Sequence, residues 1–305
     1  MSEIVLILGN GFDLDLGLKS RYSDFSFSVE WDELYRRREK YLQNEQNHNQ
    51  SLLEQIKDAR CDAWFDLEEE INIFVHRQIN LNPKQITIDC NKKDYSLLKY
   101  TLKNYLVRIS DAYKLNTACL SLCLLNAVFN NKHSNKQIFS FNYTDCIKLC
   151  KFYGAPKGLL EYIHGSLNED IVLGCEVYDG NKINRNYSFL YKYNMLNKPN
   201  KIVKNLLEAK EVVFFGHSIN EMDFCYFKEY FKAASTTVGR DKHLTIICKD
   251  KESEIRIKDN IRSQGIIVTD LYNNLDVFDF IHTDLVYAEN IKENRKWNNL
   301  INRIK

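Results

Sequence analysis

Glu3-Ile4-Val5-Leu6-Ile7-Leu8-Gly9-Asn10-Gly11-Phe12-Asp13-Leu14, near the start of the chain, is the stretch that decides the fold. Its five consecutive apolar residues, Ile4 to Leu8, predict a strand buried on both faces, as in a parallel sheet. Gly9 and Gly11 then allow backbone angles and close approaches that a Cβ would forbid. The polar residues beside these glycines follow the carboxyl end of the strand, where open α/β sheets bind ligands.

The glycine pattern leaves two interpretations open. A dinucleotide fingerprint needs a third glycine three residues after Gly11, where Leu14 stands, and no Gly-Lys-Ser/Thr follows for a P-loop. One interpretation is a phosphate- or nucleotide-binding turn, which the polar side chains of Asn10 and Asp13 favour. The other is a tight turn between a strand and the next element, without a ligand.

Composition places the chain among ordinary soluble globular proteins. Of its 305 residues 44% are hydrophobic and 27% charged, and the net charge of +1 gives no overall field that would attract nucleic acid. The first apolar run is too short for a signal peptide or a membrane span, so we expect a cytoplasmic protein with no membrane partner. Nine cysteines without a Cys-X-X-Cys pair predict reduced, mostly buried thiols and no metal site.

The apolar pattern predicts one α/β domain over residues 1–305, with a large helical insertion after the first strand. About 100 residues of mostly helical periodicity separate that strand from the next, far more than an ordinary crossover needs. We therefore interpret residues 26–134 as a helical insertion or lid, and residues 275–305 as C-terminal helices. Further buried strands are predicted at 137–141, 159–163, 171–174, 211–215, 244–248 and 266–269.

Short polar clusters follow four of the predicted strands. If the strands are parallel, their carboxyl ends lie on one edge of the sheet, so these clusters should meet in a single cleft of nucleotide size. The clusters are Gly9-Asn10-Gly11, Asn142-Tyr143-Thr144-Asp145, His164-Gly165 and Gly216-His217-Ser218.

Two charged runs lie inside the predicted insertion. In Trp64-Phe65-Asp66-Leu67-Glu68-Glu69-Glu70-Ile71, helical spacing places Glu68 close to the apolar edge. This carboxylate either points into a cleft or belongs to a solvated acidic face. The second run, Arg36-Arg37-Arg38, is interpreted as a solvated helix face, with a phosphate contact as the alternative.

Motifs spread over residues 4 to 231 carry a family resemblance. They are Gly9-Asn10-Gly11-Phe12-Asp13-Leu14, Gly17-Leu18, Tyr22-Ser23-Asp24-Phe25, Trp64 to Glu68, Phe141-Asn142-Tyr143-Thr144, His164-Gly165, Gly216-His217-Ser218, Asp223 and Tyr226-Phe227. In this order they resemble the bacteriophage abortive infection protein AbiH family. The resemblance implies a role in bacterial defence against phage, together with a homo-oligomer or a partner defence protein that keeps an effector silent before infection.

The AbiH family is in turn similar to sirtuin-like proteins, which implies a sirtuin-like Rossmann-type parallel sheet that binds NAD. Sirtuins cleave the bond between nicotinamide and ribose with an Asn after one strand and a His followed by Gly. The resemblance gives these catalytic places to Asn142 and His164, the phosphate and adenosine side of NAD to Gly9, Asn10, Gly11 and Phe12, and the ribose side to Gly216 and Ser218. Further residues expected at the site are Asp13, Thr144, Asp145, Gly165, His217 and Asp223, with Tyr22, Asp66, Glu68 and Tyr143 as possible lining.

The chain also departs from the sirtuin pattern. Sirtuins place an Asp two residues after the Asn, where this chain has Thr144, with Asp145 one residue further on. The zinc-binding cysteine quartet of protein deacetylases is missing from the sequence, so we do not expect deacetylation of acetyl-lysine.

Three functional hypotheses follow. The first is an NAD-hydrolysing effector, in which Asn142 aligns the water or the ribose, His164 is the general base, and Asp13, Asp145 or Glu68 steadies the developing positive charge. A lone His such as His164 also has a plain interpretation, as a hydrogen-bonded core residue. The second hypothesis is a non-catalytic sensor or scaffold that binds NAD or ADP-ribose. The third is a metal-dependent nuclease toxin, with Asp13, Asp66, Glu68 and Asp223 as ligands.

Overall fold

A computed structural model describes residues 3–42, 51–60, 66–79, 81, 83–156, 158–175, 184–192, 200–237 and 239–305. The chain divides into two compact units. The sheet unit comprises Met1–Leu18, Lys114–Ile163 and Lys198–Lys305, and the helical unit comprises Lys19–Tyr113 and His164–Asn197.

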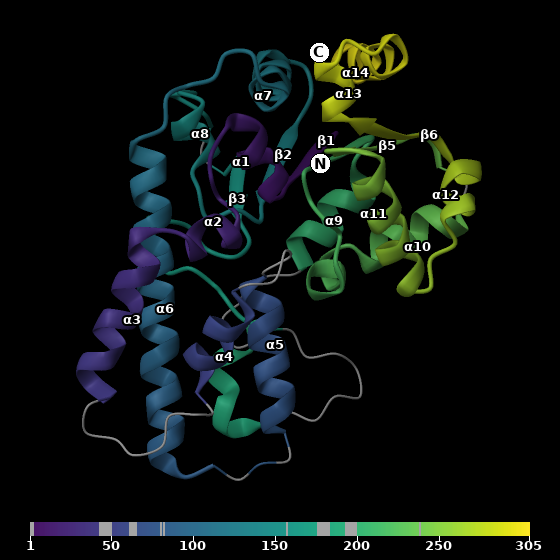
Figure 1. Ribbon diagram of the computed structural model, residues 1–305. Coiled ribbons are helices and arrows are strands. Elements are labelled where there is room, and N and C mark those ends of the chain that lie inside the picture. The colour runs from purple at the N-terminus through teal and green to yellow at the C-terminus, as the bar shows by residue number, and fades with distance from the viewer. Residues whose placement is uncertain are drawn as a thin grey trace. The chain divides into compact units, whose positions relative to one another are not determined.

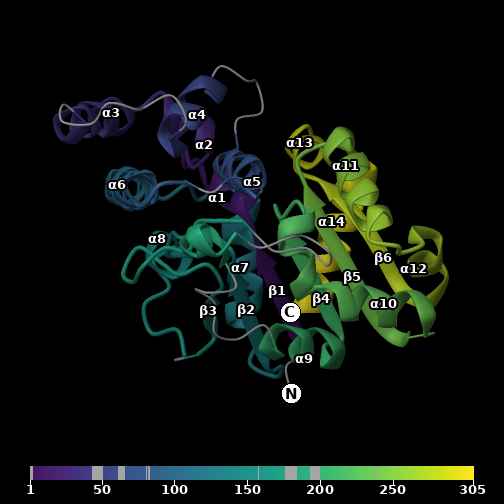
Figure 2. The same cartoon turned by 90° about the horizontal axis from the view of Figure 1, so that it is seen from below.

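In the described residues, six strands form one sheet in the order β3-β2-β1-β4-β5-β6, and each neighbouring pair is parallel (Figures 1 and 2). This confirms the predicted α/β class and a Rossmann-type order, which reverses direction between β1 and β4. The strands are β1 (Ile4–Leu8), β2 (Lys136–Ser140), β3 (Leu160–Tyr162), β4 (Glu211–Phe215), β5 (Gly239–Cys248) and β6 (Leu275–His282).

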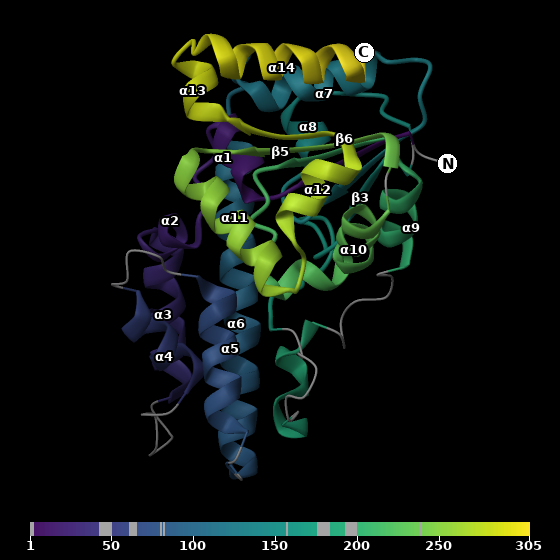
Figure 3. The same cartoon turned by 90° about the vertical axis from the view of Figure 1, so that its right-hand side faces the viewer.

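Strand β1 lies at the centre of the sheet, and all five of its residues are buried. Figure 3 shows α7 and α14 on one face of the sheet and α10, α11 and α12 on the other, which explains why β1 is apolar throughout. The helices of this unit are α1 (Asn10–Leu16), α7 (Leu120–Asn130), α8 (Cys146–Leu149), α9 (Asn200–Glu208), α10 (Lys228–Thr236), α11 (Lys251–Ser263), α12 (Val268–Asn274), α13 (Thr283–Tyr287) and α14 (Ile291–Ile304), with the 3-10 helix η3 (Glu221–Tyr226).

The end of the chain differs from the prediction. Residues 266–269, predicted as a strand, lead into helix α12 instead. The prediction of helices over 275–305 is wrong for its first eight residues, which form β6, and holds for α13 and α14. Leu275, Phe278 and Ile281 are three residues apart, a spacing that mimics a helix face, and β6 pairs with β5 at the edge of the sheet, where alternation is less regular.

The run at 171–174, also predicted as a strand, is not one. It belongs to the helical unit, where Ile171 and Leu173 are buried and the Tyr95 hydroxyl donates to the Leu173 carbonyl at 2.5 Å. Its apolar residues therefore fix a loop against a helix, because a side chain supplies a hydrogen bond that a neighbouring strand would otherwise supply.

The helical unit is built around α6, which packs against α3 and α4, while α4 also packs against α5 (Figure 1). The predicted insertion, residues 26–134, spans α3 to α7, but α7 belongs to the sheet unit, and the helical unit also contains 164–197. Its role as a lid stays a prediction. The elements of this unit are α2 (Tyr22–Ser26), α3 (Val29–Leu42), α4 (Leu52–Ala59), α5 (Leu67–Gln78), α6 (Gln85–Asp111) and the 3-10 helix η1 (Arg185–Leu190).

The basic run of α3 is only partly the solvated face that the sequence predicts. Arg36 and Arg37 are exposed and pair with Glu33. Arg38 is buried instead, with its Nε 3.2 Å from Asp94 Oδ1 and a second ion pair to Glu54. A buried guanidinium needs such partners, and α6 and α4 supply them.

The thiols agree with the prediction where they are described. Eight cysteines in the described residues are free thiols, and five of them are buried. Trp64 and Phe65 of the acidic motif lie outside the described residues.

Candidate functional site

The turns after β1 and β4 are bonded to each other at the point where the strand order reverses. The Gly9 N–H donates to the Phe215 carbonyl at 3.0 Å, and the Gly11 N–H donates to the Gly216 carbonyl at 2.9 Å. Helix α1 begins at Asn10, so the predicted glycine loop is the first turn of a helix. The Phe12 N–H also stays inside this turn, since it donates to the Gly9 carbonyl at 2.9 Å.

Close approach of backbones explains the glycines. A Cβ at Gly9 would lie 2.6 Å from the Cα of His217, and one at Gly11 would lie 2.5 Å from the Cα of Gly216. Gly216 has φ +64°, and its Cβ would lie 2.3 Å from the Cα of Gly11. These glycines are therefore needed for the turn itself, and the N–H groups of Gly9, Gly11 and Phe12 are already donated within the protein.

A buried carboxylate joins the ends of β1 and β2. Asp13, on α1, is 2% exposed. Its Oδ1 accepts from Asn142 Nδ2 at 2.8 Å, and its Oδ2 accepts from Thr144 Oγ1 at 2.5 Å. Asn142 Nδ2 also donates to the Gly9 carbonyl at 2.9 Å. Burial raises the pKa of the Asp13 carboxyl to about 6, and the hydrogen bonds from Thr144 and Asn142 oppose this shift only in part.

His217 follows β4 and is fixed by its surroundings. Its Nδ1 accepts from the Ile219 N–H at 2.9 Å, and its Nε2 lies 3.6 Å from Asp223 Oδ2. The ring lies edge-on to those of Phe141 and Phe227. Because Nδ1 accepts a hydrogen bond, the ring proton of the neutral imidazole belongs on Nε2, facing the Asp223 carboxylate. This arrangement suits a fixed, site-lining His better than a general base.

The other predicted residues of the sheet unit differ in exposure. Phe12 is buried, with its ring centroid 5.4 Å from that of Phe215, so it is a core residue. Asp145 caps α8 by accepting from the Lys148 N–H at 3.0 Å. Tyr143 is buried, whereas Asn10 and Ser218 are exposed on either side of the β1–β4 contact.

Five predicted site residues belong to the helical unit: His164, Gly165, Tyr22, Asp66 and Glu68. His164 is buried, and its carbonyl accepts from the Val172 N–H at 2.7 Å. Gly165 has φ +79°, and a Cβ there would lie 2.0 Å from the Asp170 carbonyl oxygen. The His-Gly pair therefore opens a tight loop, in which only glycine fits at the second position.

The two acidic residues have structural partners. Asp66 caps α5 by accepting from the Glu68 N–H at 2.9 Å. Glu68 forms an ion pair with Lys192, whose side chain is fully buried, at 2.9 Å. Tyr22 is half-buried at the start of α2. The ion pair with Lys192 favours a buried, paired Glu68 over a solvated acidic face.

Lys192 is the residue that sequence reasoning missed. It ends the run Tyr187-Ser188-Phe189-Leu190-Tyr191, so the signal was a single cation at the end of an apolar, aromatic segment. A lysine is almost never fully buried without an acidic partner. The residues next to Lys192 in the sequence gave no indication that this partner is Glu68.

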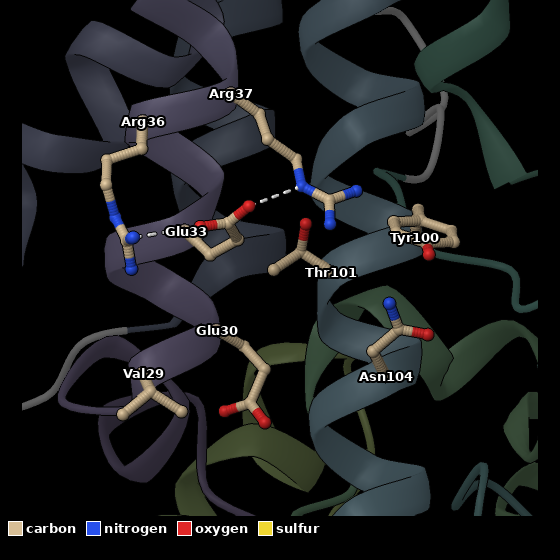
Figure 4. Close-up of a pocket in the computed structure, with 8 residues that line it drawn as sticks. All are labelled: Val29, Glu30, Glu33, Arg36, Arg37, Tyr100, Thr101 and Asn104. Carbon is tan, nitrogen blue, oxygen red and sulfur yellow. Dashed lines mark hydrogen bonds and ion pairs between the residues drawn. The ribbon is translucent and has the colours of Figure 1, made fainter.

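A groove of about 320 Å³ lies between α3 and α6 in the helical unit (Figure 4). It contains no predicted site residue. Arg37 bonds Glu33 at 2.8 Å and lies over the ring of Tyr100, so its guanidinium already has partners within the protein. The lining residues are Val29, Glu30, Glu33, Arg36, Arg37, Tyr100, Thr101 and Asn104.

Within the part of the chain that the structure describes, no group of three or more His, Cys, Asp or Glu side chains is arranged to hold a metal ion. The acids of the nuclease hypothesis are divided, two to each unit. Nor does any helix among the described residues have the length and apolarity to cross a membrane.

Strand order and the polar contacts at the point of reversal define a doubly wound α/β protein with a candidate ligand site where β1 and β4 end. The chain belongs to the family described as bacteriophage abortive infection AbiH, whose model matches residues 5–240. Membership indicates a role in defence against phage by abortive infection. Comparisons with curated proteins and with solved structures found no match. The family match ends within β5, so β6 and α11 to α14 lie beyond it.

Proposed function

We propose that this protein is an abortive-infection effector that binds NAD where β1, β2 and β4 end and hydrolyses the bond between nicotinamide and ribose. The observation that carries the proposal is the placement of Asn142, whose amide lies against Gly9 and Asp13 beside the reversal of strand order. Ligands of open α/β sheets bind at this position. The chemistry is the one that the expected resemblance to sirtuin-like proteins implies.

The reaction makes modest demands on the protein. The C–N bond to the ribose breaks, its electron pair leaves with the positively charged nicotinamide ring, and the ribose becomes oxocarbenium-like. Water adds to the ribose and loses a proton, which gives nicotinamide, ADP-ribose and H⁺. Asn142 orients the water or the ribose hydroxyls, and His164 takes the proton, as the resemblance implies. In this proposal the side chains of Asn10 and Ser218, which are exposed, contact the ligand.

The test is chromatography of nucleotides after the purified protein has been incubated with NAD. We expect nicotinamide and ADP-ribose from the wild type and none from Asn142→Ala. Asn274→Ala is the matched control, because it also removes an Asn that bonds one backbone carbonyl, Ser235 at 2.8 Å, but at the amino end of β6. His164→Ala should also be inactive, and His76→Ala, on an exposed position of α5, should not.

Two results would contradict hydrolysis. One is intact NAD with the wild type both in purified form and in phage-infected cells that carry the chain. The other is full activity of Asn142→Ala in a protein that keeps the wild-type thermal midpoint.

A second candidate, nucleotide binding without turnover, is favoured by a different observation. The N–H groups of Gly9, Gly11 and Phe12 all donate to acceptors within the protein. These hydrogen bonds fix the conformation of the turn, and a rigid turn suits a sensor or scaffold that binds a nucleotide without reacting with it. This candidate predicts that ADP-ribose raises the thermal midpoint while NAD yields no nicotinamide.

A further inference from the structure

Asn142 has a side-chain orientation that its neighbours dictate. Its Nδ2 lies 2.9 Å from the Gly9 carbonyl oxygen and 2.8 Å from Asp13 Oδ1. Both partners are acceptors, so the amide must turn its NH₂ toward them. A flipped amide would place Oδ1 against a carbonyl and a carboxylate oxygen. The amide carbonyl of Asn142 is therefore directed away from Asp13.

Asp13 has little contact with solvent of its own. It is 2% exposed, one oxygen accepts from Asn142, and the other accepts from Thr144 Oγ1 at 2.5 Å. Its backbone carbonyl accepts from the Leu18 N–H at 3.0 Å, a local hydrogen bond at the carboxyl end of α1. A carboxylate enclosed in this way acts on a ligand through the groups it binds, not by direct contact.

We infer that Asp13 is a positioning residue, which fixes the amide of Asn142 so that its carbonyl oxygen faces the ligand. The inference rests on the proposed function, and it replaces the expectation that Asp13 steadies positive charge on the ribose. The two roles differ in what they require of position 13. Positioning requires an acceptor facing Asn142, whereas charge stabilisation requires a carboxylate.

Thr144 allows the two roles to be separated. Its hydroxyl donates to Asp13 in the wild type, but a hydroxyl can rotate and accept instead. In Asp13→Asn, the new amide can therefore present its oxygen to Asn142 and its NH₂ to Thr144. That variant keeps the acceptor and loses the charge, while Asp13→Leu has a similar size and loses both.

The first experiment compares nicotinamide release by the wild type, Asp13→Asn and Asp13→Leu. We expect Asp13→Asn to keep kcat within about threefold, and Asp13→Leu to lose about tenfold or more in kcat, because misorientation acts on the reacting geometry. Loss of kcat in Asp13→Asn equal to that in Asp13→Leu would overturn positioning in favour of charge.

Thr144→Val in the Asp13→Asn background removes the acceptor for the new NH₂. We therefore expect kcat of the double variant to fall below that of Asp13→Asn. An unchanged kcat would show that the hydrogen bond from position 13 to Thr144 does not hold the pair, and would also overturn the inference.

The second experiment needs no turnover. The side-chain NH₂ signals of Asn142, assigned by their loss in Asn142→Asp, are recorded by ¹H–¹⁵N NMR. We expect them to keep their positions in Asp13→Asn and to move in Asp13→Leu. The control is Asp15→Leu on the same helix, since Asp15 bonds Ser121 and Tyr287 instead. It should leave the Asn142 signals in place.

Together the experiments separate the two proposals. If the wild type releases no nicotinamide but the Asn142 signals depend on Asp13 as expected, NAD hydrolysis falls and the positioning contact stands. If the wild type is active and the Asn142 signals are the same in Asp13→Leu, with both proteins folded by circular dichroism, the positioning role falls and hydrolysis stands.

Discussion

Two buried carboxylates lie shortly after strands of the same sheet, and they differ in the charge of the groups that donate hydrogen bonds to them. In the Asp13 corner (Asp13, Asn142 and Thr144) the carboxylate accepts from neutral donors. In the Glu254 corner (Glu254, Lys251, Lys258 and His282) Glu254 accepts from both lysines at 2.8 and 2.6 Å, and His282 Nε2 lies 2.8 Å from it. Glu254 lies in the first turn of α11, which begins just after β5, and His282 ends β6.

The difference in partners moves the two pKa values apart. Burial raises the pKa of Asp13 to about 6, because neutral donors compensate too little. Burial also acts to raise the pKa of Glu254, but the hydrogen bonds from Lys251, Lys258 and His282 prevail and lower it to about 2. A carboxyl that titrates near neutral pH is typical of functional sites, whereas a cation-paired carboxylate is typical of structure. Only the Asp13 corner lies within the family match.

The largest expected effect comes from a substitution next to the Asp13 corner, which disrupts the contact between the β1 and β4 turns. Gly216→Ala places a Cβ 2.3 Å from the Cα of Gly11, at φ +64°. We expect it to lower the free energy of unfolding by about 4 kcal/mol or to prevent folding, since backbone must move. Urea titration followed by circular dichroism measures this.

The control is Gly265→Ala, just after the helix that carries Glu254. Gly265 has φ +79° with nothing within 4 Å of a new Cβ, so the cost should be about 1 kcal/mol. Equal costs for the two alanines would show that the contact between the β1 and β4 turns is not tight.

Next in size is the loss of charge in each corner. Glu254→Gln at pH 7.5 should cost about 2.5 kcal/mol, because three charge-assisted hydrogen bonds weaken. Asp13→Asn at the same pH should stay within about 1 kcal/mol of the wild type, since removing a buried charge offsets any weaker hydrogen bond. Thermal unfolding of both variants tests the contrast, and a larger loss for Asp13→Asn would reverse it.

The dependence on pH should have opposite signs in the two corners. Asp13 has a folded-state pKa of about 6, above its ordinary 3.8, so the folded protein binds this proton more tightly and the stabilisation fades as pH rises toward 6. Relative to Asp13→Asn, the wild type should therefore be about 2 kcal/mol more stable at pH 4.5 than at pH 7.5.

Glu254 behaves in the other direction. Its folded-state pKa of about 2 lies below the ordinary 4.5, so its stabilisation is present above pH 4.5 and is lost as pH falls toward 2. Unfolding of wild type, Asp13→Asn and Glu254→Gln across pH 3 to 7.5 gives both slopes. Slopes of the same sign would refute the comparison.

The smallest expected effect tests one hydrogen bond of the Asp13 corner, the one that Thr144 donates to Asp13. Thr144→Val removes a hydrogen bond that lowers the pKa of Asp13, so that pKa should rise further, at a cost of about 1 kcal/mol in stability at pH 7.5. Carboxyl ¹³C titration by NMR measures the shift. Lys258→Met should raise the pKa of Glu254 in the same experiment, and an unchanged Asp13 pKa in Thr144→Val would contradict the assigned partner.

Much of the sheet could be predicted, and the strand that was missed, β6, has a physical reason. Strands β1 and β4 contain buried apolar runs, because neighbouring strands and helices cover them. Strand β6 lies at the edge, and its apolar residues also fit a helix. Burial on both faces makes a strand easy to identify from the sequence, because a continuous apolar run leaves no competing helical period.

The site was predictable at the level of which strand ends meet, not of which atoms bond. Parallel topology brings Gly9, Asn142 and Gly216 to one edge, as expected, whereas His164-Gly165, the fourth predicted cluster, belongs to the helical unit. The N–H groups of Gly9 and Gly11 donate to carbonyls at the end of β4, and these hydrogen bonds depend on packing between segments that are distant in the sequence. The pair Glu68–Lys192 was missed for the same reason, because its partners are 124 residues apart.

The central position of β1 has a consequence for synthesis. Ile4 lies opposite Lys136 on one side and Glu211 on the other, so the second partner leaves the ribosome about 200 residues after the first strand. At bacterial elongation rates the nascent chain carries an unpaired apolar segment for on the order of ten seconds or more. Chaperone supply and growth temperature should therefore govern the yield of folded protein, and refolding from denaturant should be slow, as for other chains whose first contacts are so remote.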